Sequence, residues 1–216
     1  MNLAEKIKEL HASKYKFVIV SSGGGSNAIA SLLKVPGASN TVLEAYIPYA
    51  KESLDFYLMK KPDFYASKDT SLRMAARAYS AAKKIDQESS LNHLLGVSIT
   101  ASLSTTYEKR GDHKFHIALQ TRDFSKSISC KLEKGQRTRE EEEELVTAFV
   151  VNLLAECSEL EYDYPKIPEE VVFDEVKAEK GWAELMSNKI NYVLSEDASP
   201  ELIFPGAFYP YHDGHK

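Results

Sequence analysis

The sequence contains few cysteines, and neither stands in a spacing typical of a metal site or a redox motif. The two residues, Cys130 and Cys157, lie far apart in the chain. Isolated thiols of this kind favour buried, reduced side chains and a reducing compartment. The chain also lacks a run of roughly 18 apolar residues, which a membrane-spanning helix requires. We therefore expect a soluble, cytoplasmic protein that makes no contact with a membrane.

An excess of positive charge is missing as well. The formal net charge is -5 and the isoelectric point is about 5.7. Because phosphate backbones are bound through basic stripes, nucleic acid is not an expected partner. Hydrophobic residues make up 43% of the 216 residues, which is enough for a full core. One domain with a short additional segment is the expected organisation.

Helix-like and strand-like patterns alternate along most of the chain. Apolar residues recur at helical spacing over 3–10, and the β-branched run 17–20 has the length of a buried strand. Further strands are expected over 42–47, 94–101, 115–121 and 125–132, and helices over 27–33, 51–59 and 71–84, the last capped by Asp69 or Thr70. The alternation and the hairpin predict a three-layer α/β/α domain with a mixed sheet.

A proline-punctuated polar stretch over 162–170 has the texture of a linker. It predicts a domain over 1–160, followed by a connector over 161–200 that contains a short helix around 182–192. The residues 201–216 would then begin another domain.

A glutamate run over 140–144 has two interpretations, an acidic surface tract or the start of a helix. The run precedes apolar residues at helical spacing, among them Val146 and Phe149. Acidic residues in a first turn are stabilised by the helix dipole, by roughly 0.3 to 1 kcal/mol each. We therefore expect a helix, and no metal site.

A glycine-serine segment over 21–26 joins the strand 17–20 to the helix that follows it. Such a junction directs free backbone N–H groups and a positive dipole end toward one place, which suits an anion. The hydroxyls of Ser22 and Ser26 can bind phosphate oxygens, and a serine beside a base can attack an acyl carbon. A plain strand-helix turn with Ser26 as the N-cap explains the same residues.

The segment 21–54 resembles the opening of the CinA C-terminal domain, the nicotinamide-nucleotide amidase family. That family reads ESCTGG, a helix, a PGSS-like turn, a strand and TYSNEAK, and this chain follows the same order without a gap. Ala66-Ser67 before Met74-Ala75 and the strand 96–100 extend the resemblance, which covers about 5–158.

The resemblance implies an amidohydrolase that converts nicotinamide mononucleotide to nicotinic acid mononucleotide and ammonia. It places the nucleophile on Ser22 and the site tyrosine on Tyr49, and it implies a small-molecule nucleotide ligand, a homo-oligomer and no cofactor. The implied phosphate- and nucleotide-binding residues are Gly23, Gly24, Gly25, Ser26, Thr105 and Arg139.

Three departures from the family put the chemistry in doubt. The family's lysine falls on Leu54, and Lys51, one turn earlier, is a candidate substitute or a surface lysine. Residues 101–106 stand in the place of the family's GIAGPDGG loop. The family has an acidic residue directly before the nucleophile, and this chain has Ser21 there. His113 and His116 are candidate bases, although a strand-edge histidine is usually a polar surface residue.

The last residues of the sequence resemble the GSFNPxHxGH signature of the nucleotidyltransferase superfamily, with His212 and His215 in the place of its two histidines. In that superfamily the histidines bind triphosphate, and the alternative here is a tag-like histidine tail. The signature implies that residues 201–216 begin a truncated nucleotidyltransferase-like domain of a longer polypeptide.

Two function hypotheses follow. The first is an amidase-like domain of pyridine nucleotide metabolism with impaired or lost activity. The second is a non-catalytic nucleotide-binding or dimerisation module fused to a nucleotidyltransferase. An unrelated nucleotide or sugar phosphate in the glycine loop also remains open, because backbone contacts do not specify the rest of a ligand.

Overall fold

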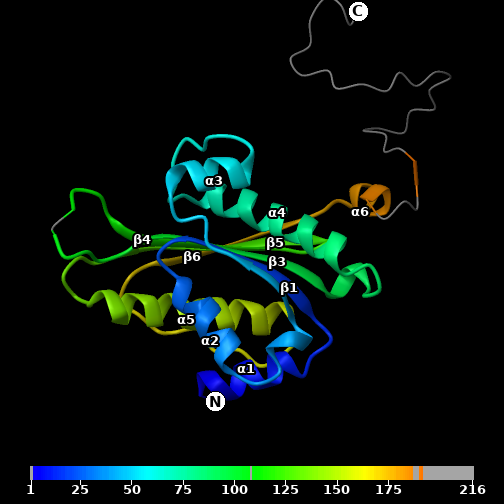
Figure 1. The fold of residues 1–216 in the computed structure, drawn as a ribbon, viewed down its shortest axis with the longest axis horizontal. Helices are drawn as coiled ribbons and strands as arrows, with labels where there is room; N and C mark the ends of the chain where they lie inside the picture. Colours follow the sequence, from blue (N-terminus) through cyan, green and yellow to red (C-terminus); the bar gives the residue numbers. More distant parts are fainter. Residues whose placement is uncertain (1, 108, 187–189, 192–216) are drawn as a thin grey trace, which may run out of the picture. The chain divides into compact units, whose positions relative to one another are not determined.

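A mixed six-stranded sheet forms the centre of the domain (Figure 1). A computed structural model describes residues 2–107, 109–186 and 190–191. The strand order is β2-β1-β3-β4-β5-β6, in which the first three strands are parallel and the last three join antiparallel. The strands are β1 (Lys16–Gly23), β2 (Val42–Tyr46), β3 (Leu94–Ser102), β4 (His113–Gln120), β5 (Phe124–Leu132) and β6 (Val171–Lys177).

Helices cover both faces of the sheet, so the predicted three-layer α/β/α architecture with a mixed sheet is confirmed (Figure 1). One face carries α1 (Leu3–His11), α2 (Ser26–Lys34) and α5 (Arg139–Cys157), and the other carries α3 (Lys51–Leu58) and α4 (Lys68–Ile85). Alternation along β1 builds both interfaces, because Phe17 and Ile19 enter the first core and Val18 and Val20 the second.

The close packing of α4 on β3 depends on small residues along that strand. Gly96 faces the helix, and a Cβ there would lie 2.1 Å from the backbone nitrogen of Tyr79 and 2.2 Å from the carbonyl oxygen of Ala75. Ser98 donates to the carbonyl of Ser71 at 2.6 Å. The side of β3 that faces α4 therefore carries Gly96 and the hydrogen-bonded Ser98, in positions where a buried strand usually has aliphatic residues.

Several predicted element ends shift in the structure. The cap of α4 is Ser67, whose hydroxyl accepts from the Thr70 N–H, so the helix begins earlier than a cap at Asp69 or Thr70 implied. β1 continues through the serines to Gly23, because these residues pair in parallel register with β3. The helix expected from the glutamate run is α5, which Thr138 opens with a capping box.

The segment predicted to be a connector contributes the edge strand β6, which pairs with β5. The compact unit accordingly extends to Ala178 rather than ending at residue 160. The polar stretch before β6 is held by the domain: Tyr164 stacks on Phe149, with ring centroids 5.8 Å apart, and donates to Glu156 at 2.7 Å. Proline spacing alone does not reveal these contacts.

A second unit begins at Glu179, and its described part contains α6 (Lys180–Met186). This helix begins slightly before the predicted 182–192. His212 and His215 lie outside the described residues. Both cysteines are free and buried. Within the residues that the structure describes, no helix is long and apolar enough to span a membrane.

Candidate functional site

Ser22 lies near the end of β1, on the face of the sheet that carries α3. Its register partner on β3 is Thr100. The side chain is largely buried, and its hydroxyl donates a hydrogen bond of 2.9 Å to the backbone carbonyl of Pro48. A carbonyl oxygen fixes the hydroxyl but does not remove its proton under neutral conditions. Ser22 is therefore positioned but not activated by this contact.

A small pocket of about 120 Å³ brings together the residues expected at the catalytic centre. Ser22, Gly23, Tyr49 and Lys51 line it, together with the unpredicted Tyr65. The remaining lining residues are Ala50, Leu54, Ala66, Thr100 and Ala101. The structure thus brings Ser22, Gly23, Tyr49 and Lys51 to one pocket. Ligand pockets usually measure roughly 300 to 1,000 Å³, so this one is small for a nucleotide.

The titratable groups of this pocket are Tyr49, Lys51 and Tyr65. Tyr49 is 71% exposed. The Lys51 ammonium lies 5.7 Å from the centroid of the Tyr65 ring. Burial raises the pKa of Tyr65, as does Asp55, whose carboxylate accepts from its hydroxyl at 3.3 Å. Neither carboxylate nor imidazole is present among the described residues that line the pocket.

Leu54, which stands where the family has a lysine, belongs to the core. Only 1% of the residue is exposed, and it packs in the cluster of Val18, Val20 and Met74 between α3, α4 and the sheet. An uncompensated charge at such a position costs several kcal/mol, on the order of the penalty for burying an ion. A leucine rather than a lysine at position 54 therefore suits its buried place in the core.

The glycines of the loop are explained by close packing against β3. A Cβ on Gly23 would lie 2.2 Å from the carbonyl oxygen of Ala101, and one on Gly25 would lie 2.4 Å from Cγ2 of Ile99. Both glycines also have positive φ, +77° and +95°. A Cβ on Gly24 would meet the Leu103 side chain at 2.5 Å. These positions require glycine whether or not a ligand binds.

Two backbone N–H groups of the loop, those of Gly24 and Gly25, are not free, contrary to the expectation from sequence. Gly24 donates to the Ala101 carbonyl at 3.0 Å. Gly25 donates to the Glu143 carboxylate at 2.8 Å, and Asn27 donates to the same oxygen at 3.4 Å. The N-terminus of α2 therefore already holds an anion, supplied by a side chain of α5.

Ser26 is the first residue of α2, and Gly25 rather than Ser26 is the N-cap. It lines a groove of about 840 Å³ between α2 and α5. Three glutamates, Glu140, Glu143 and Glu144, line the same groove. Their negative charge opposes phosphate binding at Ser26.

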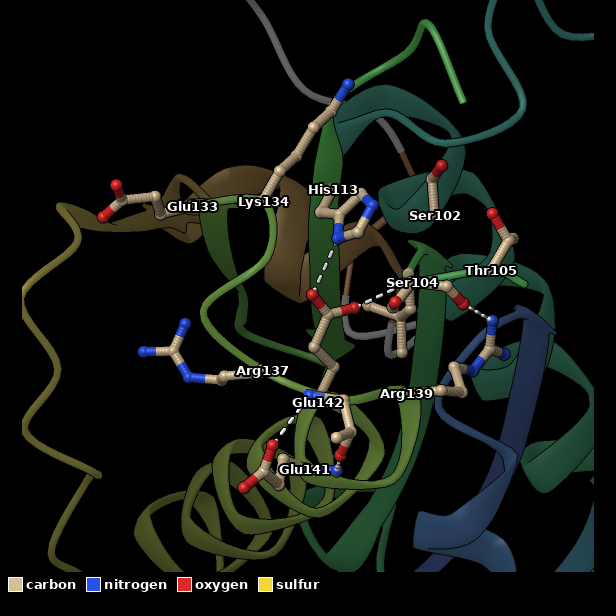
Figure 2. A network of polar contacts seen from close by, with 12 residues as sticks. Ser102, Ser104, Thr105, His113, Glu133, Lys134, Arg137, Arg139, Glu141 and Glu142 are labelled. Carbon is tan, nitrogen blue, oxygen red and sulfur yellow. Dashed lines mark hydrogen bonds and ion pairs between the residues drawn. The ribbon is translucent and has the colours of Figure 1, made fainter. Parts of the chain in front are cut away.

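Thr105 and Arg139 do not line the pocket of Ser22. The Thr105 hydroxyl donates to the carbonyl of Tyr107 at 2.6 Å. Arg139 donates to the Ser104 carbonyl at 3.2 Å (Figure 2). It also donates to Glu143 at 2.9 Å, so its guanidinium is partly neutralised. The implied nucleotide-binding residues therefore divide between two places in the domain.

Glu142 is a buried residue that sequence reasoning missed. It is fully buried, and its carboxylate contacts Nδ1 of His113 at 2.8 Å and accepts from the Ser104 N–H at 2.6 Å (Figure 2). The signal was available, because position 142 precedes Val146 and Phe149 by four and seven residues and so shares their apolar face. Glu142 ties the loop after β3 to the start of α5.

Neither His113 nor His116 lines the pocket of Ser22. His113 is buried against Glu142 rather than lying at the surface, and His116 bonds to the Ser129 hydroxyl at 2.8 Å. Burial, aided by Lys114, lowers the pKa of His116 to about 4. Among the described residues, no group of three or more histidine, cysteine, aspartate or glutamate side chains is placed to hold a metal ion.

Comparison with solved structures identifies the fold. The competence/damage-inducible protein CihA from Agrobacterium tumefaciens matches with a TM-score of 0.57 and 15% identity, covering 72% of this chain and 94% of that one. A competence or damage-inducible protein from Enterobacter asburiae matches with a TM-score of 0.56 and 14% identity, covering 72% and 96%.

A CinA superfamily protein from Enterobacter cloacae has a TM-score of 0.54 and 14% identity, covering 71% of this chain and 93% of that one. No family model matches the sequence, and no curated protein matches it. The class is thus a three-layer α/β domain. More particularly, the chain has the CinA-like fold.

Proposed function

We propose that this chain is a nicotinamide-nucleotide amidase-like domain whose amidohydrolase activity is impaired or lost. The observation that carries the proposal is the contact of Ser22 with the Pro48 carbonyl, in a small pocket whose lining holds neither carboxylate nor imidazole. An unactivated serine hydroxyl is a weak nucleophile at neutral pH. Lys51 is the candidate base that the sequence analysis named and that lines this pocket.

The surroundings of the glycine loop support the same proposal. The Glu143 carboxylate accepts the hydrogen bond of the Gly25 N–H group. The resemblance implies that this N–H group binds phosphate. A second anion there would meet the Glu143 carboxylate at short range, and the pairing of that carboxylate with Arg139 only partly offsets the repulsion. Phosphate binding would require Glu143 to move away and to release Arg139 for the ligand.

The test is formation of ammonia and nicotinic acid mononucleotide from nicotinamide mononucleotide by the purified chain and by Ser22→Ala. We expect Ser22-dependent turnover to be absent or far slower than that of an active nicotinamide-nucleotide amidase assayed alongside. Turnover at the rate of that enzyme, abolished by Ser22→Ala, would contradict the proposal and would require a base other than the residues of the family motif. Lys51→Met would then show whether Lys51 supplies it.

A non-catalytic nucleotide-binding or dimerisation module is the alternative role for the same fold. The resemblance of residues 201–216 to a nucleotidyltransferase signature favours it, because such a module would serve the adjoining domain. Calorimetry with nicotinamide mononucleotide tests binding, and sedimentation equilibrium tests the proposed homo-oligomer. A monomer that binds no nucleotide would refute this alternative.

A further inference from the structure

A larger pocket lies beside the pocket of Ser22, between β2, α3 and α4. Its volume is about 600 Å³, within the size range of small-molecule sites. Pro48 links the two places, because it lines the larger pocket and its carbonyl accepts the hydrogen bond from Ser22. None of the residues assigned to the amidase site lines the larger pocket. We call it the β2-α3 pocket.

Its walls are aromatic and apolar side chains that remain exposed. Phe56 is 86% exposed and Met59 is 79% exposed, and Tyr46 and Ile47 are about half exposed. The rings of Tyr46 and Tyr57 lie 5.7 Å apart at a tilt of 47°. Large apolar side chains gathered in a hollow are characteristic of binding sites, because water covers them at a free-energy cost.

Two cations line the same pocket. The guanidinium of Arg77 lies 5.2 Å from the centroid of the Tyr57 ring, and Lys84 lies on the same helix, α4. Within the part of the chain that the structure describes, neither side chain forms an ion pair. A guanidinium is well suited to a carboxylate, which it binds through two parallel hydrogen bonds.

Glu44 is the acidic residue among the described lining residues. Its negative charge limits how much negative charge a ligand in the pocket can carry. Its carboxylate interacts with the Tyr46 hydroxyl and thereby raises the pKa of Tyr46. Two cations and one anion leave one positive charge in excess. A ligand with a single negative charge balances the pocket, whereas a multiply charged phosphate would also face the repulsion of Glu44.

Tyr57 supplies a further polar group. Its hydroxyl is buried and has no hydrogen-bond partner in the described part of the chain. Buried polar atoms in proteins nearly always have partners, so the Tyr57 hydroxyl is a group to which a bound water or ligand can supply one. Burial is the main reason that the pKa of Tyr57 is raised, so the hydroxyl keeps its proton and can donate to an anion.

We propose that the β2-α3 pocket binds a small aromatic molecule that carries one anionic group. The ring lies against Tyr46 and Phe56, and the anionic group meets Arg77. Aromatic side chains and arginine are the residues that contribute most to binding energy in such sites. The proposal does not depend on the amidase-like function, because Ser22 lies outside this pocket.

The first experiment is calorimetry of the purified chain with four probes. Indole-3-acetate supplies the ring and the single negative charge, indole-3-acetamide is its neutral counterpart, tryptamine carries a positive charge, and butyrate lacks the ring. We expect saturable binding of indole-3-acetate and an affinity for each other probe at least about tenfold weaker. Equal affinities, or no binding of indole-3-acetate, would overturn the proposal.

Variants locate the site. Arg77→Gln and Phe56→Ala are expected to weaken indole-3-acetate binding by about tenfold or more. Arg73→Gln is the matched control, since Arg73 is an exposed arginine of the same helix that pairs with Asp69 at 2.9 Å and does not line the pocket. Tyr65→Ala is expected to bind the probe as the unaltered chain does, because Tyr65 lines the pocket of Ser22 and does not line the β2-α3 pocket.

Circular dichroism establishes that each variant is folded before it is titrated. Binding that Arg77→Gln and Arg73→Gln weaken equally would show that general charge attracts the probe, and this would refute the site. Loss of binding in Tyr65→Ala, with binding retained in Arg77→Gln, would place the probe in the small pocket instead. That result would refute the inference while leaving the proposed amidase-like function to its own assay.

Discussion

The carboxylate of Glu143 accepts a hydrogen bond of 2.8 Å from the backbone N–H of Gly25, at the N-terminus of α2. A side chain of α5 thus occupies the position at which a glycine-rich loop would hold a phosphate. The same carboxylate pairs with Arg139, so one residue neutralises a helix end and a cation together. This arrangement joins two helices of one layer and closes the loop to an external anion.

Removal of Glu143 tests that arrangement. Glu143→Ala is expected to lower the free energy of unfolding by about 1 to 2 kcal/mol, because it removes a charge-assisted hydrogen bond and a helix-dipole interaction. It should also bind orthophosphate about tenfold more tightly than the unaltered chain, since the helix N-terminus becomes free. Urea unfolding and calorimetry measure the two effects.

Glu144→Ala is the control for this prediction, because Glu144 is an exposed neighbour that lines the same groove. Its effect on stability should stay within about 0.5 kcal/mol. An equal effect of the two substitutions would show that general acidity, rather than the contact with Gly25, determines both stability and phosphate affinity.

Leu54 and Phe56 form a second matched pair on α3. Leu54→Ala should cost about 2 to 5 kcal/mol of unfolding free energy, because it leaves a cavity in the core. Phe56 is 86% exposed, so Phe56→Ala should change stability by no more than about 0.5 kcal/mol. Urea denaturation followed by circular dichroism gives both values. A small loss in Leu54→Ala would mean that α3 is not packed as described.

Gly96 determines how closely α4 approaches the sheet. Gly96→Ala should destabilise the domain by about 1 to 3 kcal/mol or more, because the methyl group meets backbone atoms that cannot rotate away. Gly111 has nothing within 4 Å of the equivalent Cβ position, so Gly111→Ala should be nearly neutral. Thermal unfolding of the two variants provides the comparison, and similar melting temperatures would contradict the packing.

His116 makes the domain sensitive to acid. Its pKa falls from 6.5 to about 4 on folding, so between these values the unfolded chain binds a proton that the folded chain does not. The free energy of unfolding should therefore fall as the pH is lowered through this window. The loss reaches about 2 kcal/mol once solvent screening is allowed for.

His116→Gln should remove this part of the acid sensitivity. Urea titrations at pH 7 and pH 4 compare the variant with the unaltered chain. Other groups, such as Glu169, whose pKa is lowered to about 2 by Arg137, contribute equally to both proteins and cancel in the difference. Parallel pH profiles for the two proteins would show that His116 is protonated as easily in the folded as in the unfolded chain.

Local patterns predicted much of this fold because they arise from local geometry. The period of about 3.6 residues marked α4 and α5, and β-branched runs marked β1 and β3. The resemblance pointed to Ser22 and Tyr49, which line one pocket, whereas the sequence left open whether Lys51 lies there or at the surface. The edge strand β6 was missed, because its proline-rich approach has the composition of a linker.

The sequence by itself determined the order of helices and strands as far as α5, the two buried faces of the sheet, and the identity of the residues at the end of β1. Only the tertiary structure decided what those residues do. The Gly25 contact with Glu143 spans 118 residues of sequence. The buried carboxylate of Glu142, in α5, contacts His113, which lies in β4. Periodicity reports which side of an element is apolar, whereas hydrogen-bond partners are fixed by how distant elements meet.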